Sequence, residues 1–314
     1  MSMTPTRDGD KEGGRAALTS LISPGASRGW VPWAVIGAVL LVTVGVTLIL
    51  IQGRNARPAQ TPAELQRLQQ KKFIPPTTSE GASTVMPITF PDGSTAEVVY
   101  DSKLGLAERG LRPSYSGDLT DCCFRLFAVD YELNTFVQGP ELARFPGADG
   151  APVPLRAGVQ GDPDRYLVLK VGPWSVGVPE GRSDKLTDAQ KATWAAGLVG
   201  RQTAEGFLVL EGKPPVKMTA TGEASGPSLR IGSILREGIR TFPGACRPPA
   251  GRRVRMVNGI PVRLAARFGA LCFADAPMAL QIYGDEKFIR AVVGGIQIRN
   301  VKPPQPSAPA PPSP

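Results

Sequence analysis

The longest uninterrupted apolar stretch of the chain lies near its N-terminus, from Trp30 to Gln52. No residue between Val31 and Ile51 is charged, and Val, Leu and Ile dominate this stretch. A helix rises about 1.5 Å per residue, so roughly 20 residues cross the apolar core of a bilayer. The pattern therefore predicts a single transmembrane helix over residues 30–52, through which the lipid bilayer would contact the protein.

A cleaved signal peptide is the main alternative to a permanent anchor. Signal peptides have a shorter apolar core, followed soon by a cleavage site with small residues. The sequence Gln52-Gly53-Arg54-Asn55 offers no such site, and no cysteine follows directly to accept a lipid. We therefore expect a permanent single-pass anchor in a cell membrane.

Polar stretches without periodicity border the apolar segment and end the chain. Residues 1–29 are rich in Gly, Ser and Thr and are predicted to form a disordered tail. Residues 53–86 combine a short amphipathic pattern with a Pro- and Thr-containing run, which predicts a stalk and linker. Residues 303–314 are rich in proline and are predicted to be extended and disordered.

Alternating and periodic apolar residues predict strands and helices in the remaining part. Two strand-like runs around Pro91-Asp92-Gly93 predict a hairpin, because Pro presets φ and Gly accepts a positive φ. Apolar residues at helical spacing predict a helix over residues 184–201 and a shorter one near residues 286–293.

The order strand, strand, helix, strand occurs around each of these two helices. We therefore predict an α+β fold, with a first module over residues 87–222 and a second, basic module over residues 223–302. The shared order indicates a diverged internal duplication, although chance similarity between any two α+β segments is the alternative.

The composition excludes several classes of chemistry. The 314 residues contain no histidine, which excludes Ser-His-Asp and Cys-His catalysis and zinc sites with histidine ligands. The cysteines lack Cys-x-x-Cys spacing, which argues against a thioredoxin-like site and a four-cysteine zinc site. We expect neither a cofactor nor a metal site.

All four cysteines, Cys122, Cys123, Cys246 and Cys272, follow the apolar segment, which suits an oxidising compartment. Adjacent residues of a strand point to opposite faces. We therefore expect Cys122 and Cys123 to form separate disulfides with Cys246 and Cys272 and so to link the two modules. Buried free thiols are the alternative.

The orientation of the anchor follows from two opposing signals. More Lys and Arg follow the span than precede it, which alone favours a cytoplasmic C-terminal domain. Long domains cross the membrane largely regardless of charge, however, and the cysteines favour the outside. We expect a cytoplasmic N-terminus and an extracytoplasmic C-terminal domain.

Charge is divided unevenly between the two predicted modules. Residues 88–222 carry 14 Lys and Arg against 17 Asp and Glu, whereas residues 225–300 carry 12 against 4. We predict an anion-binding surface in the second module, for lipid headgroups, an acidic envelope polymer or the first module itself. A solvated basic face is the alternative, and no aromatic-basic pattern favours nucleic acid. The candidate residues are Arg247, Arg252, Arg253, Arg255, Arg263 and Arg267.

Two short phrases resemble a known group of proteins. The phrases are Ile88-Thr89-Phe90-Pro91-Asp92-Gly93-Ser94 and Leu104-Gly105-Leu106-Ala107-Glu108-Arg109-Gly110-Leu111-Arg112-Pro113. They are similar to phrases in uncharacterised actinobacterial envelope proteins that are anchored by a single membrane span. The resemblance implies an extracytoplasmic envelope domain and assigns no activity.

Two classes of function follow from these patterns. The first is a membrane-tethered, noncatalytic module that binds or assembles an envelope protein or an anionic polymer. The second is an envelope hydrolase or transferase that uses carboxylates, with Asp130, Glu132, Asp162 and Asp164 as candidates. That chemistry would require two carboxylates in one cleft, roughly 5 to 10 Å apart.

Overall fold

The structure is a computed structural model that describes residues 71–304, apart from gaps at 121, 133–138, 159–163, 182–183, 234–235, 245–253, 258–259, 266 and 274–276. The side chains of strand residues 255, 257, 260, 261, 264 and 265 are also outside the description. Within the described residues, no helix has the length and apolar character needed to cross a membrane. The predicted tail, transmembrane segment, first part of the stalk and nearly all of the proline-rich end lie outside the described residues.

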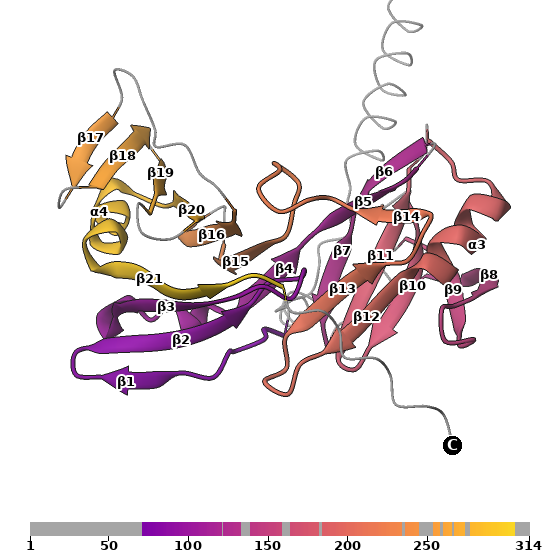
Figure 1. Cartoon of the computed structure of the whole chain (residues 1–314), viewed down its shortest axis with the longest axis horizontal. Coiled ribbons are helices and arrows are strands. Elements are labelled where there is room, and N and C mark those ends of the chain that lie inside the picture. Colours follow the sequence, from indigo (N-terminus) through magenta and orange to yellow (C-terminus); the bar gives the residue numbers. More distant parts are fainter. Residues whose placement is uncertain are drawn as a thin grey trace, which may run out of the picture. The chain divides into compact units, whose positions relative to one another are not determined.

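The largest sheet in the described part has seven antiparallel strands and draws on both predicted modules (Figure 1). Its order is β17 (Val254–Val257), β18 (Ile260–Ala265), β19 (Phe268–Cys272), β20 (Met278–Tyr283), β16 (Gly238–Pro243), β15 (Ser228–Gly232) and β4 (Leu111–Ser114). In β15, Leu229 and Ile231 are buried on one face, and Arg230 between them points to the other. This second face is central to the candidate site.

Four smaller sheets complete the described strands. One has the order β1 (Thr78–Glu80), β2 (Ser83–Thr89), β3 (Thr95–Asp101) and β21 (Ile296–Lys302). Another has the order β7 (Ala128–Tyr131), β11 (Trp174–Glu180), β10 (Arg165–Val171), β9 (Pro152–Ala157) and β8 (Glu141–Pro146). The last two are β14 (Val216–Met218), β5 (Ser116–Leu119) and β6 (Cys122–Leu126), and the pair β12 (Leu198–Gln202) and β13 (Leu208–Gly212).

Two α-helices lie between the described strands. Helix α3 (Asp188–Gly197) begins at a capping box, in which the side chains of Thr187 and Gln190 each accept a hydrogen bond from the other's backbone N–H. Helix α4 (Glu286–Gly295) is capped by Asp285, whose carboxylate accepts a hydrogen bond from a backbone N–H of the first turn. Two short 3-10 helices are η1 (Ser102–Leu104) and η2 (Ala107–Arg109).

The predicted α+β fold is wrong, because the described chain is mostly β-sheet. Each predicted module does contain a hairpin followed by a helix and a strand, β10-β11-α3-β12 and β19-β20-α4-β21, but these strands belong to four different sheets. Pairing also crosses the predicted boundary, since β4 pairs with β15 and β3 pairs with β21. Sheets shared in this way cannot form two self-contained modules.

The folded part begins earlier than the sequence predicts. Phe73 is only 5% exposed and packs edge-on against Trp174 and Phe207, with ring centroids 5.5 and 5.0 Å away. Strand β1 and most of β2 also precede residue 87. Residues 71–86, which the sequence assigned to the linker, are therefore part of the fold. The aromatic side chain of Phe73 belongs to the hydrophobic core.

Candidate anion-binding site

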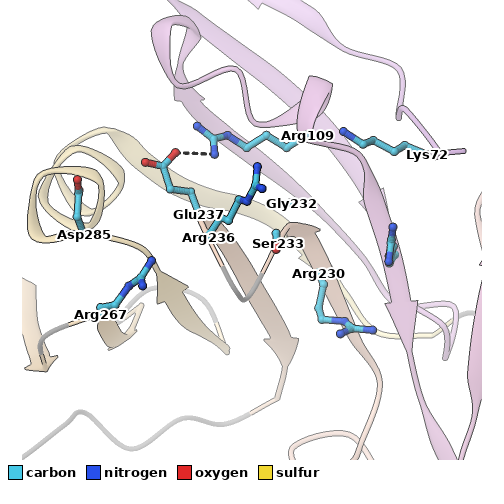
Figure 2. A pocket seen from close by; sticks show the side chains of 10 residues that line it. Lys72, Arg109, Arg230, Gly232, Ser233, Arg236, Glu237, Arg267 and Asp285 are labelled. Atoms are coloured by element: carbon cyan, nitrogen blue, oxygen red, sulfur yellow. Dashed lines mark hydrogen bonds and ion pairs between the residues drawn. The ribbon is translucent and has the colours of Figure 1, made fainter. Parts of the chain in front are cut away.

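A cleft of about 900 Å³ carries a large excess of positive charge. The basic cleft is lined by Lys72, Arg109, Arg112, Arg230, Gly232, Ser233, Arg236, Glu237, Arg267 and Asp285. Six of these side chains are cationic and two are acidic. Figure 2 shows Arg267 and Asp285 at one end of the cleft and Lys72 at the other, with Arg109 and Glu237 between them.

Both acids of the basic cleft already have partners. Glu237 Oε2 accepts a hydrogen bond from Arg109 Nη1 at 2.8 Å, an ion pair drawn as a dashed line in Figure 2. Asp285 Oδ1 caps α4 by accepting from the Phe288 backbone N–H at 2.7 Å. Among the described residues, no ion pair joins the other five cations of the cleft to a carboxylate, so the electrostatic field of the cleft favours an anion.

Three arginines lie side by side on one face of the seven-stranded sheet. Arg230 of β15 is the register partner of Arg112 on β4 and of Arg240 on β16. Residues that face each other on neighbouring strands project from the same face, so the three side chains form one row. We call Arg112, Arg230 and Arg240 the arginine row; its first two members also line the basic cleft.

The environments of Arg112 and Arg240 disfavour their positive charges. Burial lowers the pKa of Arg112, and the nearby charge of Arg230 lowers it further, although Asp130 opposes the change. Burial also lowers the pKa of Arg240, with Tyr283 opposing and Arg230 adding to the effect. Among the described residues, no ion pair joins a member of the row to a carboxylate.

The contacts that do hold the row are with neutral groups. Arg240 Nε and Nη2 each donate to Ser228 Oγ at 3.1 Å, and the guanidinium lies 4.5 Å from the centre of the Phe242 ring. Arg230 Nε is buried without a hydrogen-bond partner in the described part of the chain. A buried donor without a partner lowers the stability of the protein, so the row has room for an additional hydrogen-bond acceptor.

The structure places only part of the predicted arginine set. Arg267 is exposed and lines the basic cleft, and Arg263 is exposed on β18. Arg263 continues the register of the arginine row, because it faces Ala270, which faces Gln281, which faces Arg240. Arg255 lies in β17 with its side chain outside the description, and Arg247, Arg252 and Arg253 lie outside the described residues.

Five arginines and one lysine of this site are absent from the predicted set: Lys72, Arg109, Arg112, Arg230, Arg236 and Arg240. A signal for one of them is present in the sequence. Arg230 lies between Leu229 and Ile231, so it occupies the polar side of an alternating strand. Which strands are neighbours is not encoded in that alternation, and the row exists only through strand pairing.

The predicted disulfide pairing is wrong. Cys122 and Cys123 are bonded to each other rather than to cysteines of the second module. The prediction assumed an extended strand with alternating side chains, but Cys123 has a φ of 54°, so its backbone leaves that conformation. Cys272 is also disulfide-bonded, and Cys246 lies outside the described residues.

The candidate catalytic carboxylates do not line the basic cleft. Asp130 lies on β7, and Glu132 Oε2 accepts a hydrogen bond from Lys71 Nζ at 2.8 Å. Asp164 precedes β10, and Asp162 lies outside the described residues. Among the described residues, no group of three or more acidic, cysteine or histidine side chains is arranged to hold a metal ion.

Comparisons with protein-family models, with curated proteins and with solved structures gave no match to this chain. The functional argument therefore depends on the chemistry of the site itself.

Proposed function

We propose that the protein is a single-pass membrane protein whose domain outside the cell binds an anionic partner of the envelope without catalysing a reaction on it. The observation that carries this proposal is the composition of the basic cleft, which has six cations and only two acids, both already engaged. Such a cleft attracts anions and accommodates their charge at little cost.

The apolar segment over residues 30–52 supports the membrane part of the proposal. Lys72 lines the basic cleft and follows this segment by roughly 20 residues, which span at most about 70 Å when fully extended. A domain tethered in this way would meet anions of the envelope, such as lipid headgroups or an envelope polymer.

A carboxylate-dependent hydrolase receives less support from this site. Both acids of the basic cleft have structural partners, and Asp130, Glu132 and Asp164 are not among the residues that line it. A general acid needs a carboxyl group that can gain and lose a proton near the substrate. The cleft instead presents guanidinium groups, which stay charged and suit binding.

The proposal can be tested with the full-length chain purified in a nonionic detergent. We expect it to bind polyanions such as polyphosphate but not uncharged dextran, with affinity falling as salt rises. The double variant R236Q/R267Q removes two exposed cations of the basic cleft and should weaken binding about tenfold or more.

The matched control is R144Q/R201Q, which removes the same charge from exposed arginines on β8 and β12. This variant should bind polyphosphate as the unaltered chain does. Equal losses in the two double variants would mean that net charge alone drives binding, and the proposed site would be wrong.

A further inference from the structure

We infer that the partner is an extended chain with several phosphate groups, and that it lies across the strands of the seven-stranded sheet. This inference rests on the proposed function and adds the chemical class and the direction of the ligand. Its path is defined by the arginine row, Arg112, Arg230 and Arg240, and by Arg263 further along the same register.

The length of the path follows from sheet geometry. Neighbouring strands lie about 4.8 Å apart, so the arginine row is roughly 10 Å long. Arg263 on β18 is five strand positions from Arg112 on β4, which corresponds to roughly 24 Å across the sheet. One phosphate group cannot contact both ends of this path, whereas a chain of phosphates can.

The middle of the path has no opposing charge. Gln281 and Ala270 stand between Arg240 and Arg263 in the register, and both are uncharged. Gln281 Oε1 accepts a hydrogen bond from the Tyr283 hydroxyl at 2.9 Å, which fixes the amide on this face. A polyanion that runs along the path therefore meets cations at both ends and no carboxylate between them.

The three adjacent charges of the row favour a ligand with more than one negative charge. Like charges directly opposite each other on neighbouring strands repel, and partial burial strengthens this repulsion. A single carboxylate can offset one guanidinium, but it leaves the others in the same unfavourable setting. Closely spaced anionic groups offset all three.

Phosphate suits this arrangement better than carboxylate does. The lone pairs of a carboxylate lie in one plane, whereas the oxygens of a phosphate are arranged tetrahedrally and accept from several directions at once. Arg112, Arg230 and Arg240 project side by side from one face, so a phosphate oxygen that does not contact one guanidinium can accept from the next arginine in the row. Arginine forks also bind phosphate in a bidentate way, which lysine cannot do.

The test measures binding of the full-length chain to tripolyphosphate, to a long-chain polyphosphate and to poly-L-glutamate of comparable charge. Vesicles with and without phosphatidylglycerol provide the lipid arm. We expect the long polyphosphate to bind at least tenfold more tightly than tripolyphosphate, and more tightly than poly-L-glutamate, because it alone reaches Arg263 with suitable groups.

Two variants test the two ends of the path separately. R230Q should weaken both phosphate ligands about tenfold, because it interrupts the arginine row. R263Q should weaken only the long polyphosphate, since the short ligand does not reach β18. R201Q removes an arginine on β12 and should change neither affinity. Thermal unfolding of each variant confirms that it is folded.

The outcomes separate this inference from the proposed function. Three results would overturn the extended phosphate chain but leave anion binding intact. They are equal affinity for tripolyphosphate and long-chain polyphosphate, unchanged affinity of R263Q for the long polyphosphate, and tighter binding of poly-L-glutamate than of the long polyphosphate. Binding to phosphatidylglycerol vesicles without binding to soluble polyphosphate would also overturn it, in favour of lipid headgroups. Failure of every anion to bind would overturn the proposed function as well.

Discussion

Arg230 on β15 lies directly opposite Arg112 on β4, and the two guanidinium groups share one face of the seven-stranded sheet. Arg240 faces Arg230 from the other side. Natural sheets place opposite charges or apolar pairs at such positions, because like charges there are destabilising. An arrangement that costs stability in the free protein is expected where a ligand offsets the cost.

We therefore expect R230Q to stabilise the free protein. Removal of the central charge relieves repulsion on both sides, and the gain should be about 0.5 to 1 kcal/mol at low ionic strength. Urea unfolding measures it, and the gain should shrink as salt screens the charges. R201Q is the control, because Arg201 pairs with Glu211 at the surface and should not gain stability when replaced. A destabilised R230Q would contradict the repulsion argument.

The pair Lys191 and Glu180 ties α3 to β11 inside the protein. Lys191 Nζ lies 3.2 Å from Glu180 Oε1 and 3.0 Å from Asp188 Oδ1. Burial opposes the charge of Lys191, but hydrogen bonds to Asp188 and Glu180 raise its pKa above the ordinary value. We expect K191M to destabilise the fold by about 3 kcal/mol, because Glu180 then remains buried and, among the described residues, keeps only the ion pair with Arg165, 4.0 Å away.

The double variant K191M/E180Q separates two contributions to this loss of stability: the lost ion pair and the buried Glu180 carboxylate that K191M leaves unpaired. It should recover a large part of the stability lost in K191M, because the uncharged glutamine leaves no unpaired charge in the protein interior. K185M is the control, since Lys185 is exposed and its replacement should change the urea midpoint little. If the double variant is as unstable as K191M, the cost comes from packing around residue 191 instead.

Local elements of this fold are readable from the sequence. The hairpin β2-β3 turns through Pro91-Asp92-Gly93, where Gly93 has the expected positive φ of 85°, and this prediction is confirmed. The predicted helix over residues 184–201 is present but shorter, because β12 begins at Leu198 directly after α3. Turn residues and apolar periodicity act over a few positions, so they identify such elements.

The sheets themselves could not be predicted, because their pairings join distant segments. Strand β4 contains Pro113 and only four residues, which gives almost no local signal, yet it forms the edge of the largest sheet. The same limit applies to the site. The charge imbalance of residues 225–300 predicts a basic surface, but the alignment of Arg112 with Arg230 depends on the β4–β15 register.

The early start of the fold gives a further prediction. Phe73 is buried among aromatic rings although it precedes the first strand, so F73A should cost about 3 to 5 kcal/mol. I74A is the matched control, because Ile74 is 51% exposed and should lose little. Equal stability of the two variants in urea unfolding would place the beginning of the folded part after residue 74.

Glu97 makes the join between β3 and β21 sensitive to acid. Its pKa is lowered below 4.5 by a hydrogen bond from Asn300 and by one from Arg299, whose Nε lies 2.7 Å from Glu97 Oε2. A lowered pKa in the folded state means that this stability is fully present above about pH 4.5 and is lost as the pH falls through the folded pKa.

E97Q should therefore flatten the acid limb of the stability profile. The unaltered chain should lose more stability than E97Q between pH 5 and pH 2. The carboxylate of Glu97 gains a proton in this range, whereas the glutamine that replaces it does not. Urea midpoints at several pH values measure the difference. Parallel acid limbs for the two proteins would show that Glu97 does not couple the β3–β21 pairing to pH.

The Cys122–Cys123 disulfide allows the proposed orientation to be tested in cells. A disulfide between neighbours persists in an oxidising compartment, whereas the cytosol keeps thiols reduced. We expect a membrane-impermeant maleimide to label the full-length protein in intact spheroplasts only after treatment with an impermeant phosphine reductant. C122S/C123S should reduce this labelling, because it removes two of the four cysteines of the chain. Labelling that needs lysis but no reductant would place the domain in the cytosol, and the envelope function would then be wrong.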